Sequence, residues 1–134
     1  MSNTIEKLPN EPILVQTVDP EFSIKTQAGD MIERTLKFLD QQIEPVIYII
    51  DMSQTSMDFE DIVMGASVAT RQFALFKHPK VRETIAISSS SLASAAARGL
   101  NSPIFGYVKL KVVKTLDEAL AYARESVREM RRAS

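Results

Sequence analysis

Acidic side chains gather directly after an apolar run near the middle of the chain. The run at residues 46–50 is followed by four acids: Asp51, Asp58, Glu60 and Asp61. Carboxylates that follow a strand can hold Mg²⁺, a cation that takes oxygen ligands. Asp19 follows an earlier apolar run, so it would join them at the same edge of a parallel sheet. One hypothesis is therefore a Mg²⁺-dependent phosphoacceptor or phosphotransfer domain that uses Asp19 and Asp51.

The same acids have a structural interpretation, which we favour. Asp58 stands at the start of an expected helix, where an aspartate accepts hydrogen bonds from free backbone N–H groups. Acids in a first helical turn also complement the helix dipole. A receiver-type site needs paired acids after the first strand, whereas this chain has Asp19 alone there. The Asp-x-Asp pattern of many phosphatases is also missing.

A run of serines follows another apolar segment. Its members are Ser88, Ser89, Ser90 and Ser91. Hydroxyl and backbone N–H groups between a strand end and a helix start can hold a phosphate or a carboxylate. A polar turn with one helix N-cap is the simpler interpretation. No glycine lets the backbone approach an anion there as a P-loop does, so an anion site at these serines is a secondary prediction.

Composition narrows the chemistry further. The 134 residues include no cysteine and a single histidine, which removes thiolate chemistry and most histidine-based metal sites. His78 lies in a helix–strand connection, away from the carboxyl ends of the strands, so it cannot serve a nucleophile there as a base. The 16 basic and 17 acidic residues nearly cancel, which argues against a dedicated nucleic-acid binder. We expect no catalytic residue, no metal and no cofactor.

Apolar patterns define the elements that would position these side chains. Short apolar runs predict strands at residues 13–18, 22–24, 46–50, 84–87 and 108–112. Helical spacings and caps predict helices at residues 26–43, from Asp58 to His78, at 92–98 and from Leu116 onward. This alternation implies an α/β fold: a single-layer mixed, mostly parallel sheet of four to five strands with helices packed on it.

Length and the first residues bound the organisation. Residues 13–134 are enough for one domain with its own core. Residues 1–12 contain two prolines and predict a loosely ordered leader. The longest apolar run has five residues, far short of the roughly 20 that a membrane span needs. The N-terminus lacks the apolar core of a secretory signal, so we expect a cytoplasmic protein that does not use a membrane.

Several of these segments resemble one family. The triplet Asp51-Met52-Ser53 after a buried strand is typical of STAS domains, the SpoIIAA-like or anti-sigma factor antagonist family. The stretch from Phe22 to Leu36 is similar to that family's short strand and Thr-capped first helix, and residues 112–120 resemble its closing strand, capping box and last helix. The resemblance covers roughly residues 13–125 and implies the family's fold.

The chain departs from that family at its regulatory position. Regulated members carry a phosphorylatable serine in the turn that opens the second helix, whereas this sequence has Asp58-Phe59-Glu60-Asp61 there. We therefore expect a non-enzymatic regulatory or interaction module that binds a protein partner or a small ligand; a homodimer is also compatible with the sequence. The expected binding residues are Asp51, Met52, Ser53, Met57, Asp58, Phe59, Glu60 and Met64.

Overall fold

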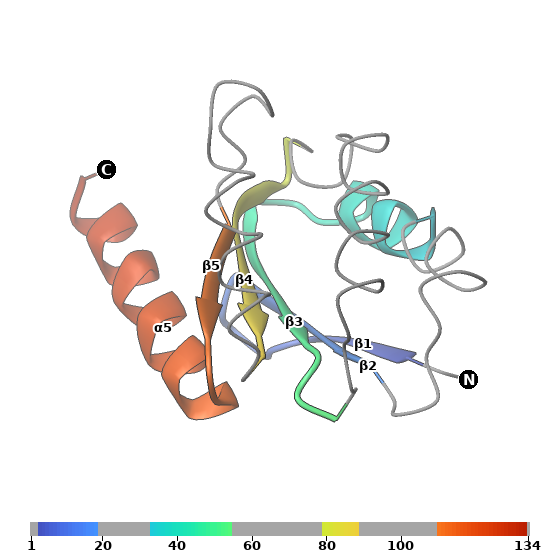
Figure 1. Ribbon diagram of the computed structural model, residues 1–134. Helices are drawn as coiled ribbons and strands as arrows, with labels where there is room; N and C mark the ends of the chain where they lie inside the picture. Colours follow the sequence, from blue (N-terminus) through green and yellow to red (C-terminus); the bar gives the residue numbers. More distant parts are fainter. Residues whose placement is uncertain (1–2, 19–32, 55–78, 89–109, 134) are drawn as a thin grey trace, which may run out of the picture.

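The computed structural model describes residues 3–18, 33–54, 79–88 and 110–133, and these form a five-stranded sheet with helices packed on it (Figure 1). In spatial order the strands are β1 (Asn3–Lys7), β2 (Ile13–Val18), β3 (Val46–Asp51), β4 (Val81–Ile87) and β5 (Leu110–Val113). β1 runs antiparallel to β2, and the other neighbours are parallel. The predicted α/β class and mixed, mostly parallel sheet are confirmed.

One face of the sheet is covered by the C-terminal helix α5 (Leu116–Ala133), which lies alongside it in Figure 1. Alternate residues of the strands point toward this helix because successive side chains of a strand face opposite ways. The helix contributes small side chains that allow close approach. The buried cluster comprises Ile13, Ile47, Ile49, Ile85, Ile87, Val113, Ala119, Ala123 and Val127.

The opposite face is covered by the helical residues 33–40. Leu39 is fully buried there against Leu14, Val46 and Tyr48. β3 thus feeds one cluster with its odd-numbered residues and the other with its even-numbered residues. Burial on both faces explains why residues 46–50 form an apolar run without polar alternation.

A side-chain cap fixes the start of α5. The backbone N–H of Glu118 donates to the Thr115 hydroxyl over 3.1 Å, which makes Thr115 the N-cap of the capping box expected within residues 112–120. Asp117 and Glu118 lie in the first turn, and Arg131 and Arg132 lie in the last. Both placements complement the helix dipole.

The N-terminal residues form a strand, so the prediction of a loosely ordered leader is wrong for residues 3–7. β1 pairs with β2 over five residues, from Asn3 opposite Val18 to Lys7 opposite Leu14. The prolines that suggested a loose segment lie in the connection between the two strands. Asn10, at its tip, adopts a φ of 62°, which asparagine tolerates. Proline suits this connection because it lacks the N–H that a strand ladder uses.

One predicted side-chain position is also wrong. The helical spacing of apolar residues within 26–43 predicts Ile43 on the buried face of that helix, but the helix ends at residue 40 and Ile43 is 96% exposed. In β5, Val113 lies in the cluster under α5, and Lys111 lies on the same face, above the Tyr122 ring. The alternation of lysine with apolar residues predicts Lys111 on the exposed side of this strand. Lys111 is exposed, and the face that it shares with Val113 is the one on which α5 packs.

Some expected elements fall outside the described residues. These are the strand at residues 22–24, the first part of the helix at 26–43, the helix that begins at Asp58, and the helix at 92–98.

We expect Thr115→Ala to lower the free energy of unfolding by about 1 kcal/mol, because it removes the acceptor that caps α5. Urea denaturation would measure this loss. Thr115→Ser keeps the hydroxyl and should retain most of the stability. Equal stability of the alanine and serine variants would contradict a capping role for this side chain.

Candidate functional site

The carboxyl ends of four strands meet along one edge of the sheet. Asp51 lies opposite Thr17 on one side and opposite Ile87 on the other, and Ile87 in turn lies opposite Val113. The predicted Asp51-Met52-Ser53 segment therefore leaves the sheet between β2 and β4. This is the edge at which ligands bind in comparable α/β sheets.

Asp51 shapes the loop that follows β3. Its Oδ1 atom accepts a hydrogen bond from the Ser53 backbone N–H over 2.9 Å and another from the Ser53 hydroxyl over 2.6 Å. This arrangement is an Asx turn, in which a side chain replaces a backbone acceptor. The backbone N–H of Met52 donates to the Ile87 carbonyl over 3.0 Å, so the loop is also tied to β4.

Ser88 continues the same edge from β4. It is 7% exposed, and its backbone N–H donates to the Val113 carbonyl over 2.9 Å. The edge is therefore continuous from the β3 loop to the end of β5. Ser89, Ser90 and Ser91 lie outside the described residues, so the predicted anion site stays a prediction.

Much of the predicted binding segment also lies outside the described part of the chain. The residues concerned are Asp19, Met57, Asp58, Phe59, Glu60 and Met64. Among the residues that the structure does describe, no three His, Asp or Glu side chains gather closely enough to hold a metal ion. The Mg²⁺ hypothesis thus depends on Asp19 and stays untested.

A buried polar cluster lies behind β3, and the sequence analysis missed it. Gln16 and Thr35 are fully buried, and Tyr48 is 1% exposed. Gln16 Oε1 accepts hydrogen bonds from the Tyr48 hydroxyl and from Thr35 Oγ1, the latter over 3.4 Å. The cluster joins β2, β3 and the helix at residues 33–40 through polar contacts inside an apolar core.

Thr84, on β4, lies beside this buried polar cluster. It lies opposite Tyr48 in the parallel pairing and is 1% exposed. Among the described residues its hydroxyl is the one buried side-chain nitrogen or oxygen atom that lacks a hydrogen-bond partner. In the sequence, Gln16 and Tyr48 each stand within a run of mostly apolar residues. A strand prediction that rests on the apolar residues of a run does not single out the polar groups within it.

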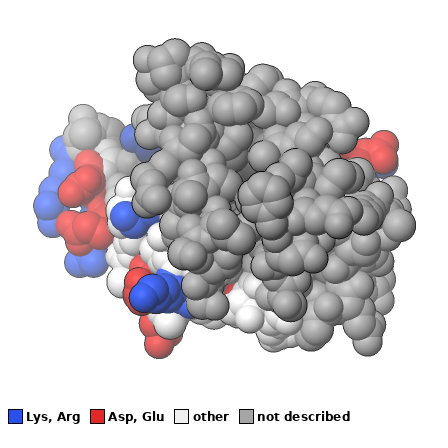
Figure 2. Space-filling view, in the orientation of Figure 1, with Lys and Arg blue, Asp and Glu red and all other residues white. Residues whose placement is uncertain are grey.

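Charged side chains fix α5 from its exposed side. Arg124 Nε lies 2.9 Å from Glu11 Oε2, which joins the helix to the β1–β2 connection. This guanidinium holds the pKa of the Glu11 carboxyl below its ordinary value. The helix surface mixes both signs of charge (Figure 2). The mixture indicates a solvated face more than an anion-binding surface.

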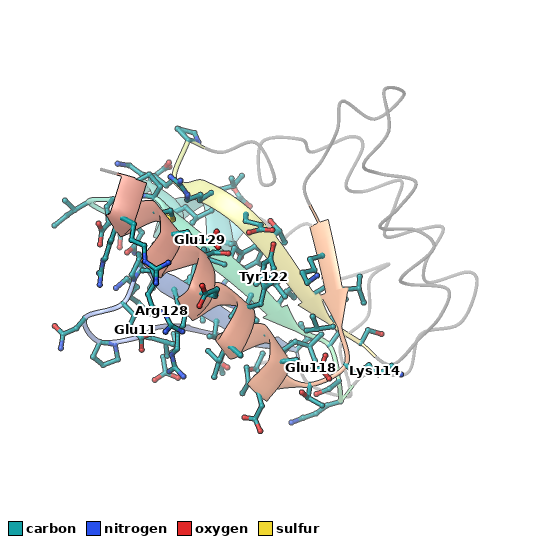
Figure 3. The ribbon with its side chains drawn as sticks, turned by 90° about the vertical axis from the view of Figure 1, so that its left-hand side faces the viewer. Glu11, Lys114, Glu118, Tyr122, Arg128 and Glu129 are labelled. Atoms are coloured by element: carbon teal, nitrogen blue, oxygen red, sulfur yellow. The ribbon has the colours of Figure 1, made fainter. Side chains whose placement is uncertain are left out.

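A second contact anchors the middle of α5. Tyr122 points from the helix toward the sheet (Figure 3), and its hydroxyl donates to Glu83 Oε1 over 2.8 Å. Lys111 Nζ lies 4.7 Å from the centre of the Tyr122 ring. The hydrogen bond to Glu83 raises the pKa of Tyr122. An irregularity between Val46 and Ile47, where the β4 partner shifts from Val81 to Glu83, helps to place Glu83 on this face.

No family model matches this sequence, and no curated protein matches it. A solved structure does: an uncharacterised protein of the DUF3478 family with a SpoIIAA-like fold, from Shewanella loihica PV-4. The match covers 90% of this chain and 91% of that chain, with a TM-score of 0.51 and 12% identity. The chain has a SpoIIAA-like fold. The predicted structural resemblance is thus confirmed, and at this identity the likeness concerns the fold alone.

No helix among the described residues is both long enough and apolar enough to cross a membrane.

We expect Asp51→Ala to loosen the loop after β3, because it removes the acceptor of two hydrogen bonds. The free energy of unfolding should fall by about 1 kcal/mol. Hydrogen exchange of the Ser53 amide should accelerate, as NMR would measure. Asp51→Asn keeps an oxygen acceptor and should preserve slow exchange. Unchanged exchange in the alanine variant would show that the turn does not depend on this carboxylate.

Alkaline pH should weaken the fold through Tyr48. Burial raises the pKa of Tyr48 well above its ordinary value, which is about 10. The unfolded chain therefore loses this proton more readily than the folded chain. Stability contributed by the neutral phenol is complete below about pH 10 and is lost as the pH rises further.

Tyr48→Phe should flatten the fall of unfolding free energy above that pH, while costing about 1 kcal/mol at neutral pH through the lost hydrogen bond to Gln16. Unfolding curves measured across the alkaline range would test both effects. Tyr122→Phe is the comparison variant: the pKa of Tyr122 is also raised, by its hydrogen bond to Glu83, but its ring is less buried, so this variant should flatten the alkaline fall less than Tyr48→Phe does. An alkaline fall of wild-type size in Tyr48→Phe would contradict this assignment.

Proposed function

We propose that this chain is a non-enzymatic interaction module that binds a protein partner through residues 51–64. The loop after β3 forms the first part of this binding segment. The Asx turn at Asp51 is the observation that carries the proposal. It gives the loop a defined shape at the edge where the carboxyl ends of the strands converge. A preformed loop lowers the ordering cost of binding.

The loop presents side chains that suit recognition. Ser53, within the turn, and Gln54, after it, are exposed, and Met52 is half-buried. Farther along the sequence, Met57, Phe59 and Met64 supply apolar and adaptable side chains, a composition that favours contact with a protein surface. The acids Asp58 and Glu60 add negative charge to the same segment.

The use of Asp51 in its own turn favours this function over phosphoryl transfer. Oδ1 is engaged by two donors from Ser53, so the carboxylate acts first as a loop-forming group. Within the described part of the chain, its Oδ2 atom accepts no hydrogen bond. The alternative function, a Mg²⁺-dependent phosphoacceptor using Asp19 and Asp51, rests on that oxygen.

Two glutamines at opposite ends of β3 allow a matched test. Gln54 follows the strand and Gln41 precedes it, and both are exposed in turns. We expect p-benzoylphenylalanine at position 54 to crosslink a discrete protein in the native host on illumination, and the same group at position 41 not to. Asp51→Ala in the position-54 variant should reduce the crosslink because the loop loses its shape.

Absence of a crosslink at position 54, or an equal one at position 41, would contradict the proposed surface. A Mg²⁺ titration followed by amide NMR tests the alternative. Saturable shifts confined to Asp51, Ser53 and their neighbours at millimolar Mg²⁺ would favour phosphoryl chemistry. No shift there would leave the interaction module as the better account.

A further inference from the structure

Among the strands that the structure describes, β1 lies at the edge of the sheet and pairs only with β2 (Figure 1). An edge strand presents a row of backbone N–H and C=O groups that a further strand can use. β1 has five residues, all paired with β2 in regular antiparallel fashion. Thr4 and Glu6 are exposed on the face that carries α5, while Ile5 points to the opposite face and packs against the Leu39 cluster.

The hydrogen-bond alternation shows which peptide groups of β1 face outward. Leu8 N–H donates to the Ile13 carbonyl over 3.0 Å, and these two residues continue the strand pairing. In an antiparallel ladder, every second residue directs both of its peptide groups to the partner strand. Thr4 and Glu6 therefore bond to β2. Asn3, Ile5 and Lys7 direct their N–H and C=O groups away from it.

We propose that β1 pairs antiparallel with β1 of a second copy of this chain, about a two-fold axis at Ile5 that runs perpendicular to the sheet. Ile5 then lies opposite Ile5 of the partner subunit, and Asn3 lies opposite Lys7 of the partner subunit. All the outward peptide groups of the strand find partners, which gives about six backbone hydrogen bonds. The two sheets become one continuous sheet with both α5 helices on the same face.

The charges on β1 select this register among the two-fold pairings. An axis at Glu6 would put two carboxylates directly opposite, and an axis at Lys7 would put two ammonium groups opposite. Like charges in such pairs are unfavourable. The axis at Ile5 instead places Glu6 opposite Thr4 of the partner subunit. An axis at Thr4 also avoids direct like-charge pairs but leaves Lys7 without a pairing partner within β1.

This self-complementarity is why we assign the edge to a second copy and not to an unrelated strand. The strand's own image, in one register, satisfies every outward peptide group without opposing like charges. The pairing also leaves the loop after β3 uncovered, because that loop emerges from the carboxyl end of a strand two positions farther into the sheet. The proposed dimer and the proposed partner-binding segment therefore use different parts of the sheet.

Charge changes at Thr4 test the pairing without disturbing the core, because this side chain is exposed. Sedimentation equilibrium of the full chain should show a monomer–dimer equilibrium. Thr4→Asp faces Glu6 of the partner subunit twice per dimer and should raise the dimer Kd by roughly tenfold. Thr4→Lys should lower it by a similar factor. Gln41→Asp, a substitution in an exposed turn, should leave it unchanged.

The absence of cysteine from the sequence permits a direct test of register. Residues 4 and 6 of opposite copies would face each other in a non-hydrogen-bonded pair with Cα atoms about 4.5 Å apart, close enough for a disulfide. An equimolar mixture of Thr4→Cys and Glu6→Cys proteins should therefore form a crosslinked heterodimer under mild oxidation. Each variant alone should crosslink far less.

A monomer throughout the micromolar range would overturn the proposal. So would a dimer whose Kd is the same in wild type, Thr4→Asp and Thr4→Lys, or one that crosslinks equally in the single-variant and mixed samples. Circular dichroism of each variant would confirm that the fold is retained. These outcomes do not affect the crosslinking test at Gln54, so the two proposals fail separately.

Discussion

The pairing of β3 with β2 and β4, inside a sheet that is covered on both faces, is the constraint on which the rest of the structure depends. β3 contacts α5 through one set of side chains and the helix at residues 33–40 through the other. Its peptide groups must be satisfied by neighbouring strands, because water does not reach them. A shift of one residue in its pairing would exchange the two faces and send Tyr48 under α5.

Polar contacts inside the core add specificity to that arrangement. An apolar core tolerates several packings of similar volume, whereas the Tyr48 hydroxyl and Thr35 must each reach the oxygen of Gln16. These bonds align the helix at residues 33–40 with β2 and β3. The same burial keeps the Tyr48 phenol neutral and makes the cluster a stabilising element only while that proton is present.

The carboxyl end of β3 is polar and exposed for a physical reason. At this end, parallel strands finish together and the backbone turns away, which leaves room for the Asx turn that Asp51 forms with the exposed Ser53. α5 is fixed at the side of the sheet by Tyr122 with Glu83 and by Arg124 with Glu11. Its packing therefore supports the sheet without occupying the edge where the loops emerge.

The sequence by itself determined the local elements and the fold class. Because β3 is buried on both faces, residues 46–50 form an apolar run, and this run predicts the strand. The helix cap could also be predicted, because it depends only on the four residues from Thr115 to Glu118. The sequence also placed Asp51 and Ser53 after that run, which is where the structure has their turn. It did not reveal that Asn3–Lys7 is a strand, because a short polar strand has no stability until β2 lies beside it.

The tertiary structure alone decided which residues meet across the sheet: Gln16 with Tyr48, Glu83 with Tyr122, and Glu11 with Arg124. Those pairs lie far apart in the chain, and their contact depends on strand order and register, which no local pattern of residues records.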